Sequence, residues 1–101
     1  MTNEMISEKD IEKRLVREVE ALGGLCIKYF NPAQTGYPDR LCLLPGGETF
    51  WVELKAPGKK LRRSQEIRKG KLEGLGQRVY VADGLDAVSR IMEIYKLRAG
   101  I

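Results

Sequence analysis

The stretch "PDRLCLLPGGETFWVELKAPGKK", residues Pro38–Lys60, holds two apolar runs on either side of a turn sequence, Pro45-Gly46-Gly47. Apolar runs of this length around a proline-glycine turn are typical of a β-hairpin. The pattern therefore predicts two antiparallel strands, Arg40–Leu44 and Thr49–Lys55, joined by that turn.

The second strand of this hairpin carries charge where a buried strand would be apolar. Side chains alternate between the two faces of a strand, so Glu53 and Lys55 share one face while Phe50, Val52 and Leu54 take the other. Charged side chains are seldom buried unless they are paired or bind a metal. One interpretation is an edge strand whose charges prevent aggregation. The other is a functional site.

The aspartate before the first strand favours the functional-site interpretation over the edge-strand interpretation. In "GYPD", Pro38 fixes its own φ angle and restricts Tyr37 to an extended conformation, which holds Asp39 at the start of the first strand. The hairpin folds this strand back, so Asp39 and Glu53 are expected to meet near one end of the pair. Two carboxylates that close need a cation or a shared proton. With Lys55 beside them, the hypothesis is a divalent metal site.

The rest of the chain places this hairpin in an α/β fold. The 101 residues, 43% hydrophobic and 32% charged, predict a single domain spanning residues 1–101. The order of expected elements is αβββαβα, which indicates a mixed sheet flanked by helices. Outside the hairpin, the expected elements are a helix at Ser7–Leu22, a strand at Leu25–Phe30, a basic helix at Ser64–Leu75, a strand at Gln77–Ala82 and a last helix beginning near Asp83.

Composition narrows the chemistry. The chain has no histidine, which excludes histidine-based catalysis and most zinc enzymes. Cys26 and Cys42 each lie in an apolar run and are interpreted as small buried hydrophobic residues. Any metal must therefore be held by oxygen, which points to Mg²⁺ or Mn²⁺. No apolar run could span a membrane, and the polar start of the sequence predicts a cytoplasmic protein.

The net charge of +4 is concentrated in one segment. Between Lys59 and Lys71 there are seven basic residues and one acid, Glu66, so this segment carries +6 and the rest of the chain −2. A concentrated basic segment favours a polyanionic partner such as nucleic acid. The alternative is a solvated, lysine-rich helix.

These residues resemble a known family. The run "GYPDR", followed by "ELK" with thirteen residues between Asp39 and Glu53, resembles the PD-(D/E)xK nuclease superfamily with its restriction-endonuclease-like core. The longer run "GGLCIKYFNPAQTGYPDRLCLLPGGETFWVELKAPGKKLRRSQ" resembles more specifically the virus-type replication-repair nuclease (VRR-NUC) domain. The likeness extends over nearly the whole chain, and none of the three motif positions departs from the family pattern.

The resemblance implies a role for each motif residue. Asp39 and Glu53 match the metal-binding carboxylates, and the backbone carbonyl of Leu54 would complete the protein ligands. Lys55 matches the motif lysine that orients the attacking water and balances developing charge. The superfamily also has a glutamate on the first helix.

Glu12 is the best match to that first-helix glutamate, as both a catalytic residue and a metal ligand. Glu8, one turn earlier, is the second choice. An ordinary solvated helix charge is the alternative for Glu12.

The same resemblance, together with the basic segment, gives a set of candidate DNA-binding residues. Gln65 matches a recurring glutamine near the start of the second helix. Lys28 could contact phosphate, but an ordinary charge on the strand surface is an equally good interpretation. The candidates are Lys28, Lys59, Lys60, Arg62, Arg63, Gln65, Arg68 and Lys69.

The leading functional hypothesis is a Mg²⁺- or Mn²⁺-dependent DNA endonuclease that selects branched DNA such as four-way (Holliday) junctions. Size and resemblance imply a homodimer that presents two cutting sites. The lack of accessory domains suggests a virus or mobile element as the source. The alternatives are a non-catalytic DNA-binding module with a nuclease-like fold and a structural or adaptor protein.

Overall fold

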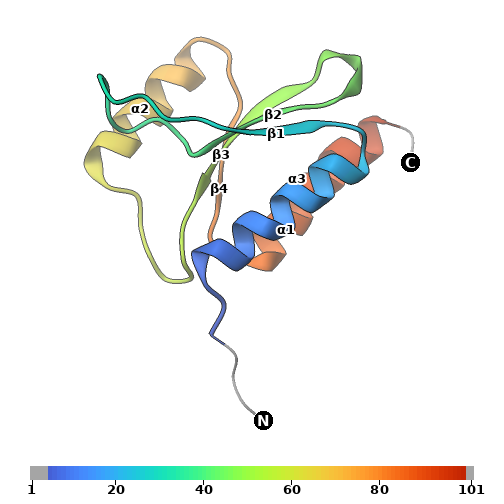
Figure 1. Ribbon diagram of the computed structural model, residues 1–101. Helices are drawn as coiled ribbons and strands as arrows, with labels where there is room; N and C mark the ends of the chain where they lie inside the picture. The colour runs from blue at the N-terminus through green and yellow to red at the C-terminus, as the bar shows by residue number, and fades with distance from the viewer. Residues whose placement is uncertain (1–4, 100–101) are drawn as a thin grey trace.

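A four-stranded mixed sheet forms the centre of the computed structural model, which describes residues 5–99 (Figure 1). The elements in chain order are α1 (Glu8–Ala21), β1 (Leu25–Lys28), β2 (Arg40–Leu43), the short 3₁₀ helix η1 (Pro45–Gly47), β3 (Thr49–Leu54), α2 (Arg63–Gly74), β4 (Val79–Ala82) and α3 (Leu85–Arg98). The strands lie in the order β1-β2-β3-β4, and only the β3–β4 pair is parallel. The predicted α/β class, element order and mixed sheet are confirmed.

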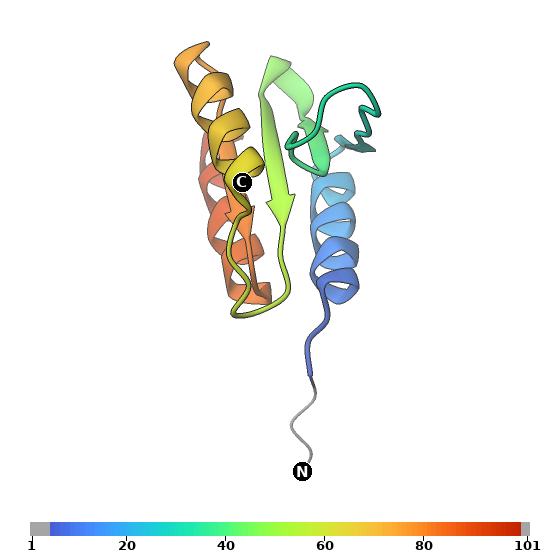
Figure 2. The same ribbon diagram turned by 90° about the vertical axis from the view of Figure 1, so that its left-hand side faces the viewer.

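Helices cover the two faces of the sheet unequally. α1 and α3 pack side by side on one face, whereas α2 lies on the other, as Figures 1 and 2 show. The larger core lies under α1 and α3 and includes Phe50, Val52 and Leu54 of β3. A smaller cluster under α2 is built on Trp51 and Leu72.

The boundaries of the elements follow local chemistry. Ser7 caps α1 in a capping box with Asp10. β1 ends at Lys28 rather than Phe30, because after the backbone bond from Tyr29 N–H to Asp39 O (2.9 Å) the chain leaves the sheet. α3 begins after Gly84 with no side-chain cap, so the predicted start near Asp83 is displaced by two residues.

β3 is an interior strand, since β2 and β4 pair with its two edges. The edge-strand interpretation of Glu53 and Lys55 is therefore wrong. The same topology places the end of β3 beside the start of β2, because the hairpin register pairs Arg40 with Val52. Asp39 and Glu53 consequently come from adjacent strands at one end of the hairpin.

Cys26 and Cys42 are free thiols on paired positions of β1 and β2, with their sulfur atoms 3.8 Å apart. Cys42 is buried and Cys26 is half-buried, in partial agreement with the expectation of buried hydrophobic residues. Within residues 5–99, no helix has the length and apolar character needed to cross a lipid bilayer.

Candidate active site

Pro38 and Asp39 change the hydrogen bonding at the end of the β2–β3 hairpin. The register would next pair Leu54 with Pro38 as a hydrogen-bonded pair, but proline has no N–H to donate to the Leu54 carbonyl. The Leu54 carbonyl therefore lacks its ladder donor, while the Leu54 N–H donates to Asp39 Oδ2 at 2.8 Å. The N–H and C=O of one strand residue point to the same side, so the Leu54 carbonyl is directed toward Asp39.

Glu53 is the buried acid of the site. The residue is only 4% exposed, and its side chain lies on the sheet face that it shares with Trp51, under α2. Oε2 accepts a hydrogen bond from Gln65 Nε2 at 2.8 Å, while Oε1 is buried and has no partner among the described residues. Burial, reinforced by the charge of Asp39, raises the pKa of Glu53 to about 8.

Lys55 supplies the positive charge on this face. Its Nζ lies 3.9 Å from Glu53 Oε2, and the Lys55 side chain is 12% exposed. At this distance the two groups attract without a close hydrogen bond. Lys55 is therefore directed to the same space as the Glu53 carboxylate, and its charge opposes the rise in the pKa of Glu53.

α2 is anchored to the site by a buried amide. Besides donating to Glu53, Gln65 accepts the backbone N–H of Arg62 at 2.8 Å, which fixes which of its ends faces the carboxylate. The loop before Asp39 packs closely on the same turn of helix: a Cβ on Gly36 would lie 2.4 Å from the carbonyl oxygen of Ser64. Gly36 also has a φ of +91°, so glycine is required there on two counts.

Glu12 does not join the carboxylate pair in the structure. Arg40 shares a face of β2 with Cys42, under α1, and its guanidinium holds Glu12 Oε2 at 2.9 and 3.0 Å. Glu53 lies on the opposite face of the sheet. Glu12 therefore does not lie with Asp39 and Glu53 as expected, because its carboxylate is paired with Arg40. Glu8 lies one turn earlier on the same side of α1 and is exposed.

The candidate DNA-binding residues divide into two groups. Gln65 is buried against Glu53, Arg68 stacks over the Tyr37 ring at 4.4 Å, and Lys69 pairs with Glu73 at 2.9 Å. These three side chains are already engaged within the chain. The remaining candidates are exposed: Lys28, Lys59, Lys60, Arg62 and Arg63.

Sequence reasoning missed an aromatic cluster beside the site. The rings of Tyr29, Tyr37 and Trp51 lie 5.1 to 6.1 Å apart, centroid to centroid, and Arg68 covers Tyr37. Contacts of this kind hold the loop that carries Asp39 against the sheet. Trp51 could have been placed there by its alternation with Glu53, but the tyrosines lie outside any regular pattern.

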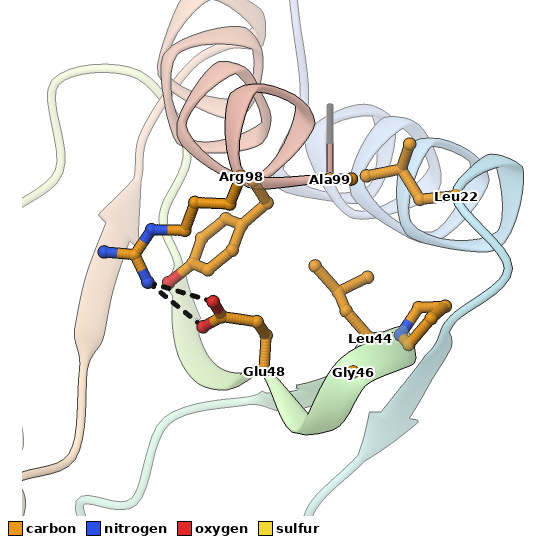
Figure 3. A pocket seen from close by; sticks show the side chains of 8 residues that line it. Leu22, Leu44, Gly46, Glu48, Arg98 and Ala99 are labelled. Carbon is orange, nitrogen blue, oxygen red and sulfur yellow. Dashed lines mark hydrogen bonds and ion pairs between the residues drawn. The ribbon is translucent and has the colours of Figure 1, made fainter. Parts of the chain in front are cut away.

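A separate cavity of about 230 Å³ lies at the far end of the hairpin, between η1 and the ends of α1 and α3 (Figure 3). Glu48 faces it and binds Arg98 at 3.1 and 3.2 Å. Glu48 precedes Glu53 by five residues of extended chain, or about 16 Å. This cavity is therefore distinct from the carboxylate pair, and its ion pairs fasten α3 to the hairpin turn.

The donor atoms at the site suit a hard cation. The carboxylates of Asp39 and Glu53 lie close together, the Leu54 carbonyl is on the side of β3 that faces Asp39, and Glu53 Oε1 is buried without a partner among residues 5–99. Within residues 5–99 no three acidic or cysteine side chains gather as a complete metal cage. Mg²⁺ commonly accepts one or two carboxylates and keeps several waters, so Asp39, Glu53 and the Leu54 carbonyl fit such an ion.

Known proteins resemble this chain in sequence and in fold. No family model matches. A protein described as "Putative nuclease p44", from Acyrthosiphon pisum secondary endosymbiont phage 1, is 44% identical over 85 residues, which cover 84% of this chain and 91% of that protein. A solved structure of a VRR_NUC domain matches with a TM-score of 0.82 and 30% identity, over 87% of this chain and 96% of that one.

Sequence and fold together define the class of protein as a nuclease. Within that class, the chain belongs to the VRR-NUC family.

Proposed function

We propose that the chain is a Mg²⁺- or Mn²⁺-dependent DNA endonuclease. One observation carries the proposal: Glu53 is a nearly fully buried carboxylate, one oxygen of which has no partner among residues 5–99, and Asp39 lies close enough for its charge to raise the pKa of Glu53. A buried, unsatisfied acid beside a second acid is costly unless it serves a ligand. In a member of a nuclease family, binding of a catalytic metal ion would offset this free-energy cost.

Each residue has a task in this proposal. Asp39, Glu53 and the Leu54 carbonyl would hold the ion, which when bound supplies Lewis-acid polarisation of the scissile phosphate. Gln65 occupies Glu53 Oε2 and so leaves Oε1 directed at the ligand. Lys55 places a positive charge where negative charge develops during phosphodiester hydrolysis.

Glu12 stands outside the ligand set in this proposal, because its recruitment would require the ion pair with Arg40 to open. Glu8 is the more accessible first-helix acid.

The proposed substrate is branched DNA such as a four-way junction, and the proposed active form is a homodimer acting in the cytoplasm. Exposed cations around the β3–α2 connection favour a polyanion. The outer edge of β1 is unpaired within residues 5–99 and exposes Leu25 and Ile27, which are 61% and 41% accessible. An open strand edge with apolar side chains favours pairing with another chain.

The test is a cleavage assay on junction, flap and linear duplex DNA, with Mg²⁺, Mn²⁺ or EDTA. Asp39→Asn is the informative variant, because an amide oxygen can still accept the Leu54 N–H while the charge is lost. The matched control is Asp86→Asn, an exposed aspartate of α3.

Paired cuts in the junction that vanish with EDTA and in Asp39→Asn, but persist in Asp86→Asn, would support the proposal. Salt-sensitive binding without cleavage of any substrate would replace it with the non-catalytic DNA-binding module.

A further inference from the structure

A stripe of cations runs along the outer side of α1, outside the basic segment recognised in the sequence. Lys9, Lys13 and Arg17 are all exposed and lie four residues apart. Residues at this spacing share one face of a helix, and each step advances about 6 Å along the axis. The three side chains therefore form a row that is inclined to the helix axis, which we call the α1 stripe.

The side chains of the α1 stripe have no close acidic partner among residues 5–99, although the charge of Lys13 adds to the lowering of the Asp10 pKa that the hydrogen bonds from Ser7 mainly cause. Across residues 5–99, none of its three side chains forms an ion pair. Neighbouring charges on α1 behave differently: Arg14 binds Glu18 at 2.7 Å, and Glu12 is held by Arg40.

The stripe also borders a hollow. A groove of about 420 Å³ follows this side of α1, with Val16 and the Arg40 side chain in its lining. The other lining residues are Lys9, Glu12, Lys13, Arg17 and Glu20. The cations outnumber the acids by four to two, and one of those acids is already paired with Arg40. A row of free cations along a concave surface suits an extended anion.

The position of the stripe relates it to the active site. The first turn of α1 and the connection between β3 and α2 lie at the same end of the molecule in both views (Figures 1 and 2). That connection carries the exposed Lys59 and Lys60. From this common end, α1 and α2 run on opposite faces of the sheet, so the two basic surfaces diverge from the end of the hairpin that carries Glu53.

We propose that the α1 stripe binds the phosphate backbone of a second DNA segment, the arm that diverges from the one held by the cations around α2. The proposal rests on the proposed function, since it takes DNA as the substrate. Lysine and arginine without aromatic neighbours indicate backbone contact rather than base readout. Two diverging basic surfaces on opposite faces match a branch point better than a continuous duplex.

The experiment measures binding in EDTA, so that it does not depend on cleavage. The triple variant Lys9→Gln, Lys13→Gln, Arg17→Gln removes the charge of the stripe and keeps good helix formers in α1. Affinity for a four-way junction and for a short linear duplex is measured over a range of salt concentrations. A single-site comparison sets Arg17→Gln against Arg90→Gln, an exposed arginine of α3 that makes no ion pair within residues 5–99.

The expected result is a loss of about tenfold or more in junction affinity at low salt. The slope of log affinity against log salt should fall by up to about 2.7, since each phosphate contact contributes about 0.9. Linear duplex should bind as in the unchanged protein, and Arg90→Gln should have no effect on either substrate. Circular dichroism of the triple variant should match that of the unchanged protein.

Three outcomes would overturn the proposal. Unchanged junction affinity and slope in the triple variant, with a loss in Lys59→Gln, Lys60→Gln, would reject the stripe and leave the DNA endonuclease standing. Equal losses on junction and linear duplex would reject the second-arm assignment. Absence of salt-sensitive DNA binding by the unchanged protein would overturn both this proposal and the proposed function.

Discussion

The buried carboxylate of Glu53 makes the metal-free protein sensitive to pH. Burial and the nearby Asp39 charge raise the pKa of Glu53 to about 8, against 4.5 for the unperturbed group. A carboxyl whose pKa is higher in the folded state stabilises the fold fully below pH 4.5, and this contribution is lost as the pH rises through 8. We therefore expect Glu53→Gln, which cannot ionise, to be more stable than the unchanged protein at pH 9.

The size of this effect has a ceiling. The interval between 4.5 and 8 corresponds to about 5 kcal/mol in the free energy of unfolding. Water entry and rearrangement around the ionised carboxylate reduce this, so we expect about 2 kcal/mol, or about 10 °C in Tm. The amide at position 53 can still accept the hydrogen bond from Gln65, so the packing of α2 should persist.

Thermal unfolding in EDTA, followed by far-UV circular dichroism at pH 5 and pH 9, measures the effect. Groups that do not interact with Glu53 titrate alike in the two proteins. The change in their Tm difference between pH 5 and pH 9 therefore reports on the Glu53 carboxyl and its immediate neighbours. Glu66→Gln, an exposed glutamate of α2, serves as the matched control and should show no pH-dependent gain. An equal Tm difference at both pH values would refute the reasoning.

Two further substitutions test how α2 and the Asp39 loop support the site. Gly36→Ala should lower the free energy of unfolding by more than about 2 kcal/mol, because the added Cβ would lie 2.4 Å from the Ser64 carbonyl oxygen. Gly58→Ala is the control: Gly58 has a similar positive φ but open space around it, so the loss should be only about 1 kcal/mol. Chemical denaturation measures both values. Gln65→Met should slow single-turnover cleavage by about tenfold, because Glu53 Oε2 loses its donor, and a rate equal to that of the unchanged enzyme would argue against a positioning role.

Much of the fold could be predicted because the hairpin is strongly patterned. The alternation correctly placed Phe50, Val52 and Leu54 on one face of the strand, which packs under α1 and α3. The proline-glycine turn correctly predicted the pairing of the two strands. Boundaries were less predictable. Phe30 is as apolar as the strand before it, yet it is 81% exposed, since the end of a strand depends on whether a neighbour remains to pair with it.

The carboxylate pair was also predictable, because Pro38 acts locally. A proline in the last ladder position has no N–H for the Leu54 carbonyl, and the aspartate that follows it accepts the Leu54 N–H. The position of Glu12 was not predictable in this way. Helical spacing allowed it to face the sheet, but its partner depends on Arg40, 28 residues away in sequence, and on which face of β2 that arginine occupies.

The contrast between Glu53 and Glu12 shows what burial adds to a motif. Both glutamates lie near basic residues, but Glu12 has two short contacts to a guanidinium, whereas Glu53 has one amide donor, a lysine at 3.9 Å and a free oxygen. A satisfied ion pair stabilises the fold and offers nothing to a ligand, whereas an under-satisfied buried acid is held ready for one. Incomplete hydrogen bonding therefore favours Glu53 over Glu12 as a ligand of the proposed metal ion.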